Sequence, residues 1–372
     1  MRRTEAAAWV VTVCAVSLRL SQAKTLAALV VATLGVERVS LANIGRRMLG
    51  RAGKASTNAK HQIKRCWRFC ANERIETADA MRGIIRRLLK RRKKTLLVAL
   101  DWVDIRGYQT LVACAVLKSR SIPICWASTT GHVYAGHKSR NAFEESLLLT
   151  LRSMVPESVK VILLADRGFG RCALAAFCRR HHFSYLIRIQ PKVIVKLKGY
   201  QGKLLDYPVF KGIAQVLKDV AYRSDGAIQQ HIVIRWRKNL PVKREECWFL
   251  MTDLNGTAAQ LCALYGRRMT IEQFFRDGKN KRNGWSLRDT QLSTPERLDR
   301  LLLILAIAYL LLCGLGLLAQ ARFKPSTWCS SGKQQCSIFR IGQIMQAKIT
   351  ASPPQIFAAI INLSETVAGK WG

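Results

Sequence analysis

Four polar side chains near the middle of the chain have a spacing that would bring them together on a helix. Arg268, Glu272 and Lys279 follow Tyr265 by three, seven and fourteen residues. At about 100° per residue, a helix gathers all four within an arc of about 60°. The stripe then combines a phenol, two cations and a carboxylate, and its cations and hydroxyl suit the binding of a phosphate group. The alternative is a solvated helix face that carries these charges by chance.

Two aspartates upstream each follow a short apolar run. Residues 96–100 precede Asp101, and residues 161–165 precede Asp166. Runs of this length and composition predict buried strands. We therefore expect both carboxylates at strand ends, where they can belong to a site. For Asp166 an alternative stays open, because the turn predicted over residues 167–170 would also suit an aspartate that caps the next helix.

Three segments carry a resemblance to a known family. They are Ala99-Leu100-Asp101-Trp102, Ala165-Asp166-Arg167-Gly168-Phe169 and the spaced Tyr-x2-Arg-x3-Glu-x6-Lys of residues 265–279. Together they resemble the DDE transposases of bacterial insertion sequences, and more narrowly the insertion-sequence family defined by that four-residue signature. The resemblance extends from residue 95 to residue 320.

The resemblance implies an α/β fold with an RNase H-like catalytic core and a mixed sheet. Asp101, Asp166 and Glu272 would be the catalytic acids. The tyrosine, arginine and lysine of the signature would hold a phosphate of the transposon end beside them. Gly278 costs the helix about 1 kcal/mol relative to alanine, so we expect Lys279 in a frayed last turn.

Physical chemistry supports a metal at these acids. Three carboxylates brought together repel one another unless a cation compensates their charge. Oxygen ligands suit Mg²⁺, and paired ions clamp the attacking and leaving oxygens of an in-line displacement. We therefore expect Asp101, Asp166 and Glu272 to bind two Mg²⁺ ions, with Mn²⁺ as a possible substitute. A zinc site is not expected, since no cluster of Cys and His with suitable spacing accompanies the acids.

The charge of the chain favours a polyanionic partner. Its 61 Lys and Arg residues outnumber 23 Asp and Glu residues, which gives a formal charge of +38. Double-stranded DNA would supply the counter-charge, and its affinity should fall steeply with salt. Charge alone does not separate a transposase from a ribosomal protein or a membrane-binding protein.

Two apolar segments raise the alternative of an exported, membrane-anchored protein. Residues 301–319 contain no charge, and residues 1–23 resemble a secretory signal. We favour a protein without membrane contact, because a fully buried core helix is also apolar on every side. The 12 cysteines include no C-x2-C pair, which suits a reducing compartment. The expected location is the cytoplasm, in association with the nucleoid.

Residues 1–94 are predicted to form a helical DNA-binding region that ends in a basic linker. Ser40 suits the cap of one helix, and Ser56 suits the start of a second. In the second helix an apolar face is expected beside a cationic one. The apolar residues are Ile63, Cys66, Trp67 and Cys70, and the cations are Lys60, Lys64 and Arg68. These cations would contact DNA phosphates, although an ordinary amphipathic surface helix fits the pattern equally well.

Residues 95–180 are predicted to be the first part of the catalytic core. Strands are expected up to Asp101, over 110–117, 122–127 and 160–165, and helices over 143–154 and 172–180. Glu144 and Glu145 compete with the other acids for a catalytic role. Their position at the start of a helix favours a role with the helix dipole instead.

The remaining residues divide into three predicted parts. Residues 181–256 read as a β-rich insertion, residues 257–320 as the second part of the core, and residues 321–372 as a helical region that is suited to dimerisation. In relatives such an insertion holds a flipped base against tryptophan, and Trp236 is the candidate here. A plain sheet residue is the alternative for Trp236.

These observations predict a cut-and-paste DNA transposase. It would nick transposon ends by hydrolysis and then join the freed 3′-hydroxyl to target DNA. Its partners would be the terminal inverted repeats and the target, and paired cleavage implies a homodimer on DNA. Two alternatives remain: an RNase H-like metal-dependent nuclease or resolvase, and an inactive basic nucleic-acid-binding protein.

Overall fold

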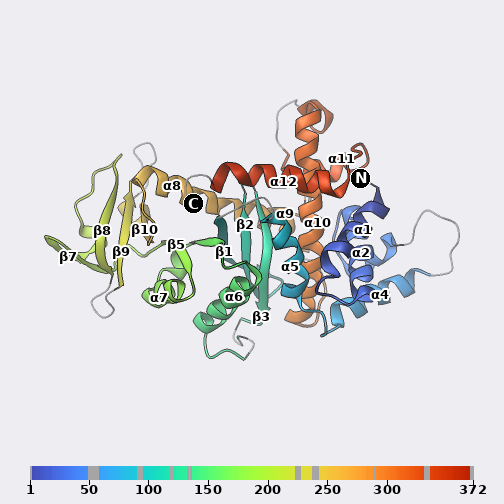
Figure 1. Ribbon diagram of the computed structural model, residues 1–372, viewed down its shortest axis with the longest axis horizontal. Helices are drawn as coiled ribbons and strands as arrows, with labels where there is room; N and C mark the ends of the chain where they lie inside the picture. The colour runs from blue at the N-terminus through green and yellow to red at the C-terminus, as the bar shows by residue number, and fades with distance from the viewer. Residues whose placement is uncertain are drawn as a thin grey trace.

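A single mixed sheet runs through the molecule, with helices packed around it (Figure 1). The computed structural model describes residues 2–48, 58–89, 95–117, 120–131, 134, 136–222, 228–236, 243–282, 284–287, 290–330 and 336–368. Within these residues the protein is mixed α/β, with ten strands in the sheet and a group of helices at the N-terminus.

The strands occur in the order β3-β2-β1-β4-β5-β10-β9-β8-β6-β7 across the sheet. Their bounds are β1 Thr95–Ile105, β2 Tyr108–Val116, β3 Ser121–Thr129, β4 Lys160–Ala165, β5 Phe183–Arg188, β6 Ile194–Leu197, β7 Tyr200–Lys203, β8 Ala214–Tyr222, β9 Ile228–Arg235 and β10 Trp248–Thr252. The central strands β1, β4 and β5 are parallel, whereas β2 and β3 extend the sheet in antiparallel fashion. This arrangement is consistent with an RNase H-like core.

The helices cover the sheet and form the N-terminal group. Their bounds are α1 Arg3–Cys14, α2 Leu20–Leu34, α3 Leu41–Arg47, α4 Ala59–Ala71, α5 Thr77–Leu88, α6 Arg140–Met154, α7 Cys172–Arg180, α8 Ala258–Gly266, α9 Thr270–Lys279, α10 Pro295–Arg322, α11 Ile338–Met345 and α12 Pro353–Ala368. The strands and helices predicted between residues 95 and 180 are confirmed, with shifts of a few residues at their ends.

The β-rich stretch after α7 continues the core sheet and does not form a separate one. β5 pairs with β4 in parallel, so the first strand after residue 181 lies inside the central sheet. β10 pairs antiparallel with β5, and β9, β8, β6 and β7 follow outward from it. The strands that project at the left end of Figure 1 therefore connect to the centre through continuous backbone pairing. The predicted domain limits themselves stay predictions.

Helix α10 is the long apolar segment predicted from the sequence. Among the described residues it alone is long and apolar enough to span a membrane, yet 89% of its most apolar window is buried inside the protein. It lies between the sheet and the N-terminal helices (Figure 1) and packs against β3, α2, α4, α5, α11 and α12. A core helix of this kind accounts for the absence of charge over residues 301–319.

Small residues allow the helices to approach α10 and α1 closely. A Cβ atom on Gly342 of α11 would lie 1.9 Å from the Leu312 carbonyl oxygen of α10. A Cβ atom on Gly83 of α5 would lie 2.0 Å from the Val13 carbonyl oxygen of α1. The apolar N-terminal segment therefore forms part of the packed core, with the side chains of Trp9 and Val10 buried.

A buried carboxylate joins α10 to the sheet. Asp299 accepts hydrogen bonds from the Ser128 hydroxyl at 2.6 Å and from the Ser128 backbone N–H at 3.2 Å. The Trp126 indole N–H donates to the Asp299 carbonyl oxygen at 3.1 Å. Burial raises the pKa of Asp299 to about 7, although the hydrogen bonds from Ser128 oppose the rise. The folded protein therefore holds a proton here that the unfolded chain releases near its ordinary aspartate pKa.

We expect Asp299→Asn to remove one part of the pH dependence of stability. Because the folded pKa is raised, the stabilising contribution is complete below the unfolded pKa of about 4 and is lost as the pH rises to about 7. The difference in unfolding free energy between variant and parent should therefore change by up to about 4 kcal/mol across this window. Urea unfolding of both proteins at a series of pH values measures it, and parallel pH profiles would contradict the expectation.

Candidate active site

The two strand aspartates lie side by side in the central sheet. Leu100 of β1 is the register partner of Ala165 of β4, and each is followed directly by its aspartate. Neighbouring strands of a sheet lie about 4.8 Å apart, so this register brings Asp101 and Asp166 together. The prediction that both acids follow buried strands is confirmed for Asp166. Asp101 lies within β1 and not at its end, because β1 continues to Ile105 in pairing with β2.

Each aspartate is held by a backbone donor. Asp101 accepts from the Trp102 backbone N–H at 2.9 Å, and Asp166 accepts from the Gly168 N–H at 2.9 Å. Asp166 thus does cap the 3₁₀ turn Arg167–Phe169, as the structural alternative anticipated. Burial raises the pKa of Asp101, the nearby Arg268 guanidinium lowers it, and the charge of Asp166 raises it further. The Asp166 carboxylate therefore lies close enough to Asp101 to raise the pKa of Asp101.

Arg268 links Asp101 to the predicted third acid. Its guanidinium donates to Asp101 at 3.0 Å and lies 3.6 Å from Glu272. Burial alone would lower the pKa of Arg268, but the nearby Tyr265, Asp101 and Asp166 raise it. The side chain of Glu272 is 44% exposed, whereas that of Arg268 is 10% exposed. A single buried cation therefore connects the carboxylates of β1 and α9.

The signature residues lie on two helices joined by a short turn. A 3₁₀ turn, Arg267–Met269, separates α8 from α9, so the signature is not carried by one uninterrupted α-helix as expected. Tyr265 and Arg268 are only 3% and 8% exposed, which excludes a solvated face for these two residues. Arg268 lies in this turn, and its guanidinium contacts Asp101 from there, a contact that the sequence did not predict.

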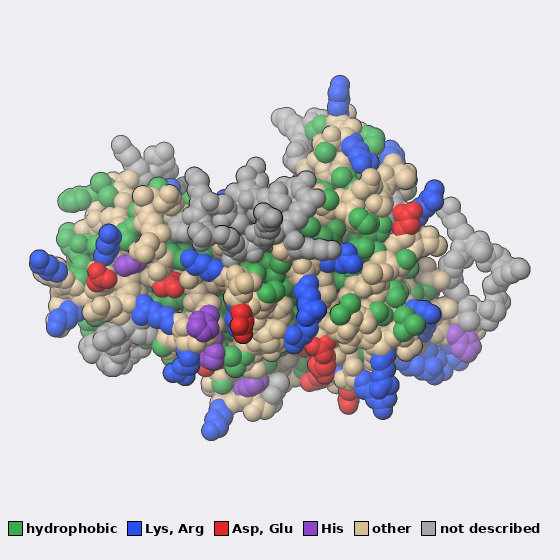
Figure 2. All heavy atoms as spheres, in the orientation of Figure 1, with side chains coloured by type: hydrophobic (Ala, Val, Ile, Leu, Met, Phe, Trp, Pro, Cys, Tyr) green, Lys and Arg blue, Asp and Glu red, His purple; other side chains and the backbone are tan. Residues whose placement is uncertain are grey.

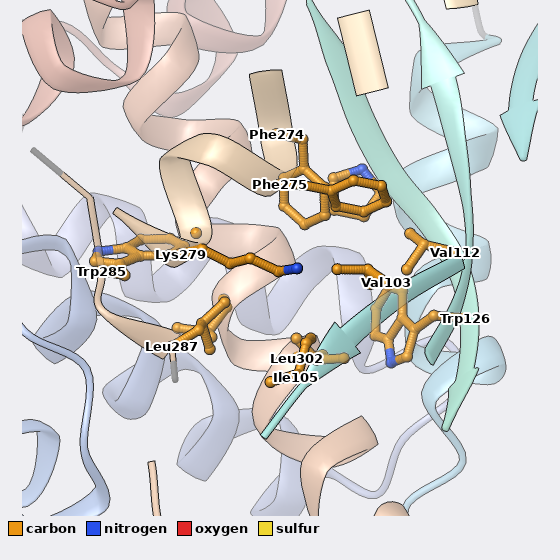
Figure 3. A pocket seen from close by; sticks show the side chains of 13 residues that line it. Val103, Ile105, Val112, Trp126, Phe274, Phe275, Lys279, Trp285, Leu287 and Leu302 are labelled. Carbon is orange, nitrogen blue, oxygen red and sulfur yellow. The ribbon is translucent and has the colours of Figure 1, made fainter. Parts of the chain in front are cut away.

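Lys279 extends into an apolar pocket beside the acids. Figure 3 shows its amine pointing toward Val103 of β1, with Phe275 on one side and Leu302 on the other. Val103 lies two residues beyond Asp101 on the same strand, and alternate residues of a strand point to the same face. Lys279 is therefore on the sheet face that carries Asp101, at the last residue of α9 as expected. Gly278 leaves room for Leu287, since a Cβ atom there would lie 2.9 Å from the Leu287 Cδ1 atom.

Further cations surround the phenol of the signature. Burial raises the pKa of Tyr265, and the charges of Arg268 and Arg188 lower it. Burial also lowers the pKa of Arg188, and neighbouring Arg167 lowers it further. Arg167 and Arg188 were not among the site residues predicted from the sequence. Arg167 directly follows Asp166, but Arg188 is the last residue of β5 and its proximity depends on the fold.

The carboxylates of the site suit a hard divalent cation by residue type. Within the described residues, no three His, Cys, Asp or Glu side chains lie together in a way that could hold a metal ion. The Arg268 guanidinium forms an ion pair with Asp101 at 3.0 Å. The groups present are carboxylate oxygens, which Mg²⁺ prefers. The residue types therefore fit Mg²⁺ or Mn²⁺.

Comparison with protein families identifies the chain. A family profile described as a transposase DDE domain matches residues 92–311, which is more than half of the chain. The chain belongs to this family of transposases. A search among curated proteins found no match. The transposase domain begins just before β1 and ends within α10, so it includes both strand aspartates and the α8–α9 signature. Family membership implies a phosphoryl-transfer enzyme that binds DNA.

The N-terminal helices of the transposase present cations as predicted. Ser40 caps α3 by accepting from the Asn43 N–H at 3.0 Å. The expected start at Ser56 lies outside the described residues, and Asn58 caps α4 instead. Lys60, Lys64 and Arg68 are all exposed. Figure 2 shows basic side chains spread over the visible face of the protein, with far fewer acidic ones.

The core face of α4 differs from its prediction at one position. Phe69 is buried with Cys66 and Cys70, whereas Trp67 is 43% exposed. Arg297 of α10 lies over the Trp67 ring at 4.4 Å from its centroid. The sequence pattern could not separate these two aromatic residues, because the choice depends on how α4 tilts against α10.

The tryptophan that contacts Tyr265 of the signature is not the one selected from the sequence. Trp236 follows β9, and Arg244 lies over its ring at 6.0 Å. Trp248, the first residue of β10, instead contacts the Tyr265 ring edge-to-face at 5.1 Å between centroids. Trp248 therefore lies beside the signature, while the role of Trp236 with a flipped base stays a prediction.

Proposed function

We propose that this transposase moves DNA by cut-and-paste transposition, through hydrolytic nicking of transposon ends and strand transfer by the freed 3′-hydroxyl. We also propose that it belongs to the insertion-sequence group with the Tyr-Arg-Glu-Lys signature and that its core is RNase H-like. The observation that carries the proposal is the register of Asp101 and Asp166 on adjacent parallel strands, joined to Glu272 through Arg268.

Asp101, Asp166 and Glu272 would hold two Mg²⁺ ions as the catalytic acids. When bound, the ions supply charge stabilisation and a more acidic attacking hydroxyl. The 44% exposure of the Glu272 side chain leaves it free to turn toward the aspartates. The backbone bonds from Trp102 and Gly168 hold the other two carboxylates in fixed directions. The acids are therefore two fixed groups and one adjustable group.

The cations around Tyr265 would bind and orient a phosphate of the DNA end. Arg268 is already desolvated, so a charge-assisted bond from it to phosphate would be strong. Arg167 and Arg188 add positive charge at the same place, and Lys279 would contribute from the end of α9. Arg268 would exchange its bond to Asp101 for one to phosphate when DNA binds, which frees the carboxylate.

The proposed partners are the terminal inverted repeats and the target DNA. Cleavage of paired ends requires two active sites, so we propose a homodimer on DNA. The proposed location is the cytoplasm, at the nucleoid and without membrane contact. Trp236 would stack on a displaced base at the end of the transposon.

Incubation of the purified protein with its flanking inverted repeats and Mg²⁺ tests the proposed function. We expect nicked ends and then products in which the 3′ end is joined to a second DNA. Broken ends without joined products would indicate a nuclease or resolvase. Retention of DNA without any broken strand would indicate a non-catalytic binding protein, and either result would contradict cut-and-paste transposition.

We expect the exposed cations of α4 to contribute to DNA affinity through phosphate. Replacing Lys60, Lys64 and Arg68 together by glutamine should make the negative slope of log affinity against log salt shallower by about three. The effect should be similar for specific and unrelated DNA if these residues contact only phosphate. Fluorescence anisotropy over a range of salt concentrations measures the slope. An unchanged slope would place the DNA on another surface.

A further inference from the structure

Glu144 is a buried carboxylate that receives three hydrogen bonds. It is 1% exposed and lies in the first turn and a half of α6. The Trp102 indole N–H donates at 2.8 Å, Arg171 donates at 2.6 Å and Arg140 donates at 3.2 Å. A buried carboxylate is costly unless it is paired and hydrogen-bonded, so these donors are required for its presence.

Two of the donors come from the segments that carry the strand aspartates. Trp102 directly follows Asp101 on β1. Arg171 is the N-cap residue of α7 and ends the short segment that Asp166 begins. Glu144 therefore connects the backbone on either side of the two carboxylates, although it contacts neither of them in any bond described above.

The contacts around Trp102 hold its ring in one place. The Phe143 ring stacks on it with centroids 5.7 Å apart and an angle of 26° between the planes. The Arg140 guanidinium lies on the ring at 4.8 Å from its centroid. Because the indole is fixed by stacking and by Glu144, the backbone N–H of Trp102 keeps its direction toward Asp101.

Arg171 depends on Glu144 as its acceptor. Its side chain is 16% exposed, and its Nε and one terminal nitrogen are buried without a hydrogen-bond partner in the part of the chain that the structure describes. Glu145 approaches Arg171 only at 3.9 Å. Loss of the Glu144 charge would therefore leave the guanidinium with only the more distant Glu145 carboxylate, and the segment between Asp166 and α7 would be held less firmly.

We propose that Glu144 is a positioning residue that fixes the separation of Asp101 and Asp166 for metal binding. This inference rests on the proposed function. In this role Glu144 does not contact substrate or metal. It acts on the two aspartates through Trp102 and Arg171. The geometry also explains why Glu144 is buried. An acid that only interacted with the α6 dipole could lie at an exposed position.

The test is Glu144→Gln, with Glu145→Gln as the matched control. Glutamine keeps the size of the side chain but removes the charge and places an NH₂ group against one of the donors. We expect unchanged DNA affinity and KM, a fall in the cleavage kcat of about 10-fold to 100-fold, and a several-fold rise in the Mg²⁺ concentration for half-maximal cleavage. Calorimetric titration of Mg²⁺ into the protein–DNA complex should show the same weakening. Glu145→Gln should change none of these.

A second pair of variants tests the contact between Glu144 and Arg171 by changing Arg171. Arg171→Met should reproduce the defect, and Arg171→Lys, which keeps a cation for Glu144, should restore most of the Mg²⁺ affinity. A merely structural role would lower the melting temperature without this recovery in Mg²⁺ affinity. If neither Glu144→Gln nor Arg171→Met folds, the positioning role is overturned in favour of a structural one.

The remaining outcomes separate this inference from the proposed function. If the parent protein cleaves DNA and folded Glu144→Gln matches its kcat and Mg²⁺ requirement within about twofold, the positioning role is wrong and the proposed function stands. The same conclusion follows if Glu145→Gln is equally impaired. If the parent protein shows no Mg²⁺-dependent cleavage, the proposed function and this inference both fail.

Discussion

Asp101→Asn and Asp166→Asn should each lower the rate of Mg²⁺-dependent DNA cleavage by at least about 10³-fold while DNA binding persists. Asparagine keeps the size of the side chain and its backbone hydrogen bond, but it lacks the charge that a divalent ion requires. Asp101 and Asp166 directly follow the register partners Leu100 and Ala165, so either loss removes one of the three proposed carboxylates from the site. Single-turnover cleavage of a labelled transposon end measures the rate.

Asp104→Asn is the control for this pair. Asp104 lies on the same strand as Asp101, but it is exposed and bonds to Gln109 and to the Gly107 N–H. Its replacement should leave the cleavage rate within about twofold of the parent. Cleavage by either catalytic-site variant at the rate of the parent would remove the basis for a metal at these strands.

Arg120→Met should lower the free energy of unfolding by about 3–5 kcal/mol. Arg120 and Asp277 form a buried ion pair at 3.2 Å, with side chains 9% and 8% exposed. Asp277 also accepts from the Tyr309 hydroxyl at 3.0 Å and the Ser337 hydroxyl at 2.9 Å. Without the guanidinium, the carboxylate would stay buried among neutral donors, and its pKa, already raised by burial, would rise further.

Chemical denaturation of the parent and the variant measures this loss. The double variant Arg120→Met with Asp277→Asn should recover a large part of it, because no unpaired charge then remains buried. Arg2→Met is a useful control, since Arg2 contacts Glu5 only at 3.9 Å and its side chain is 77% exposed. A loss of stability in the control that equals the loss in Arg120→Met would show that burial of the pair is not the cause.

Local sequence patterns predicted the strands of the site well. The apolar runs before Asp101 and Asp166 are long enough and bounded sharply enough to specify strands, and their parallel pairing then sets the two acids side by side. The continuation of β1 to Ile105 was not predictable in the same way. It depends on pairing with β2, and the residues beyond Asp101 include polar ones.

The parts of the site that sequence could not predict depend on contacts between distant segments. The turn at residues 267–269 carries Arg268, whose bond to Asp101 joins residues 167 positions apart. Glu144 looked like an ordinary acid at a helix start, and its role appears only when Trp102 and Arg171 converge on it. Spacing along one helix carries no information about such partners.

The burial of α10 depends on helices that are synthesised after it. This apolar helix is covered by α11 and α12, which follow it in the sequence, as well as by elements that precede it. Gly342 and Gly316 seat α11 directly on the α10 backbone, and Phe357 of α12 meets Trp9 of α1. A chain truncated after residue 322 would expose the apolar surface of α10 to solvent. Such a fragment would aggregate or associate with lipid.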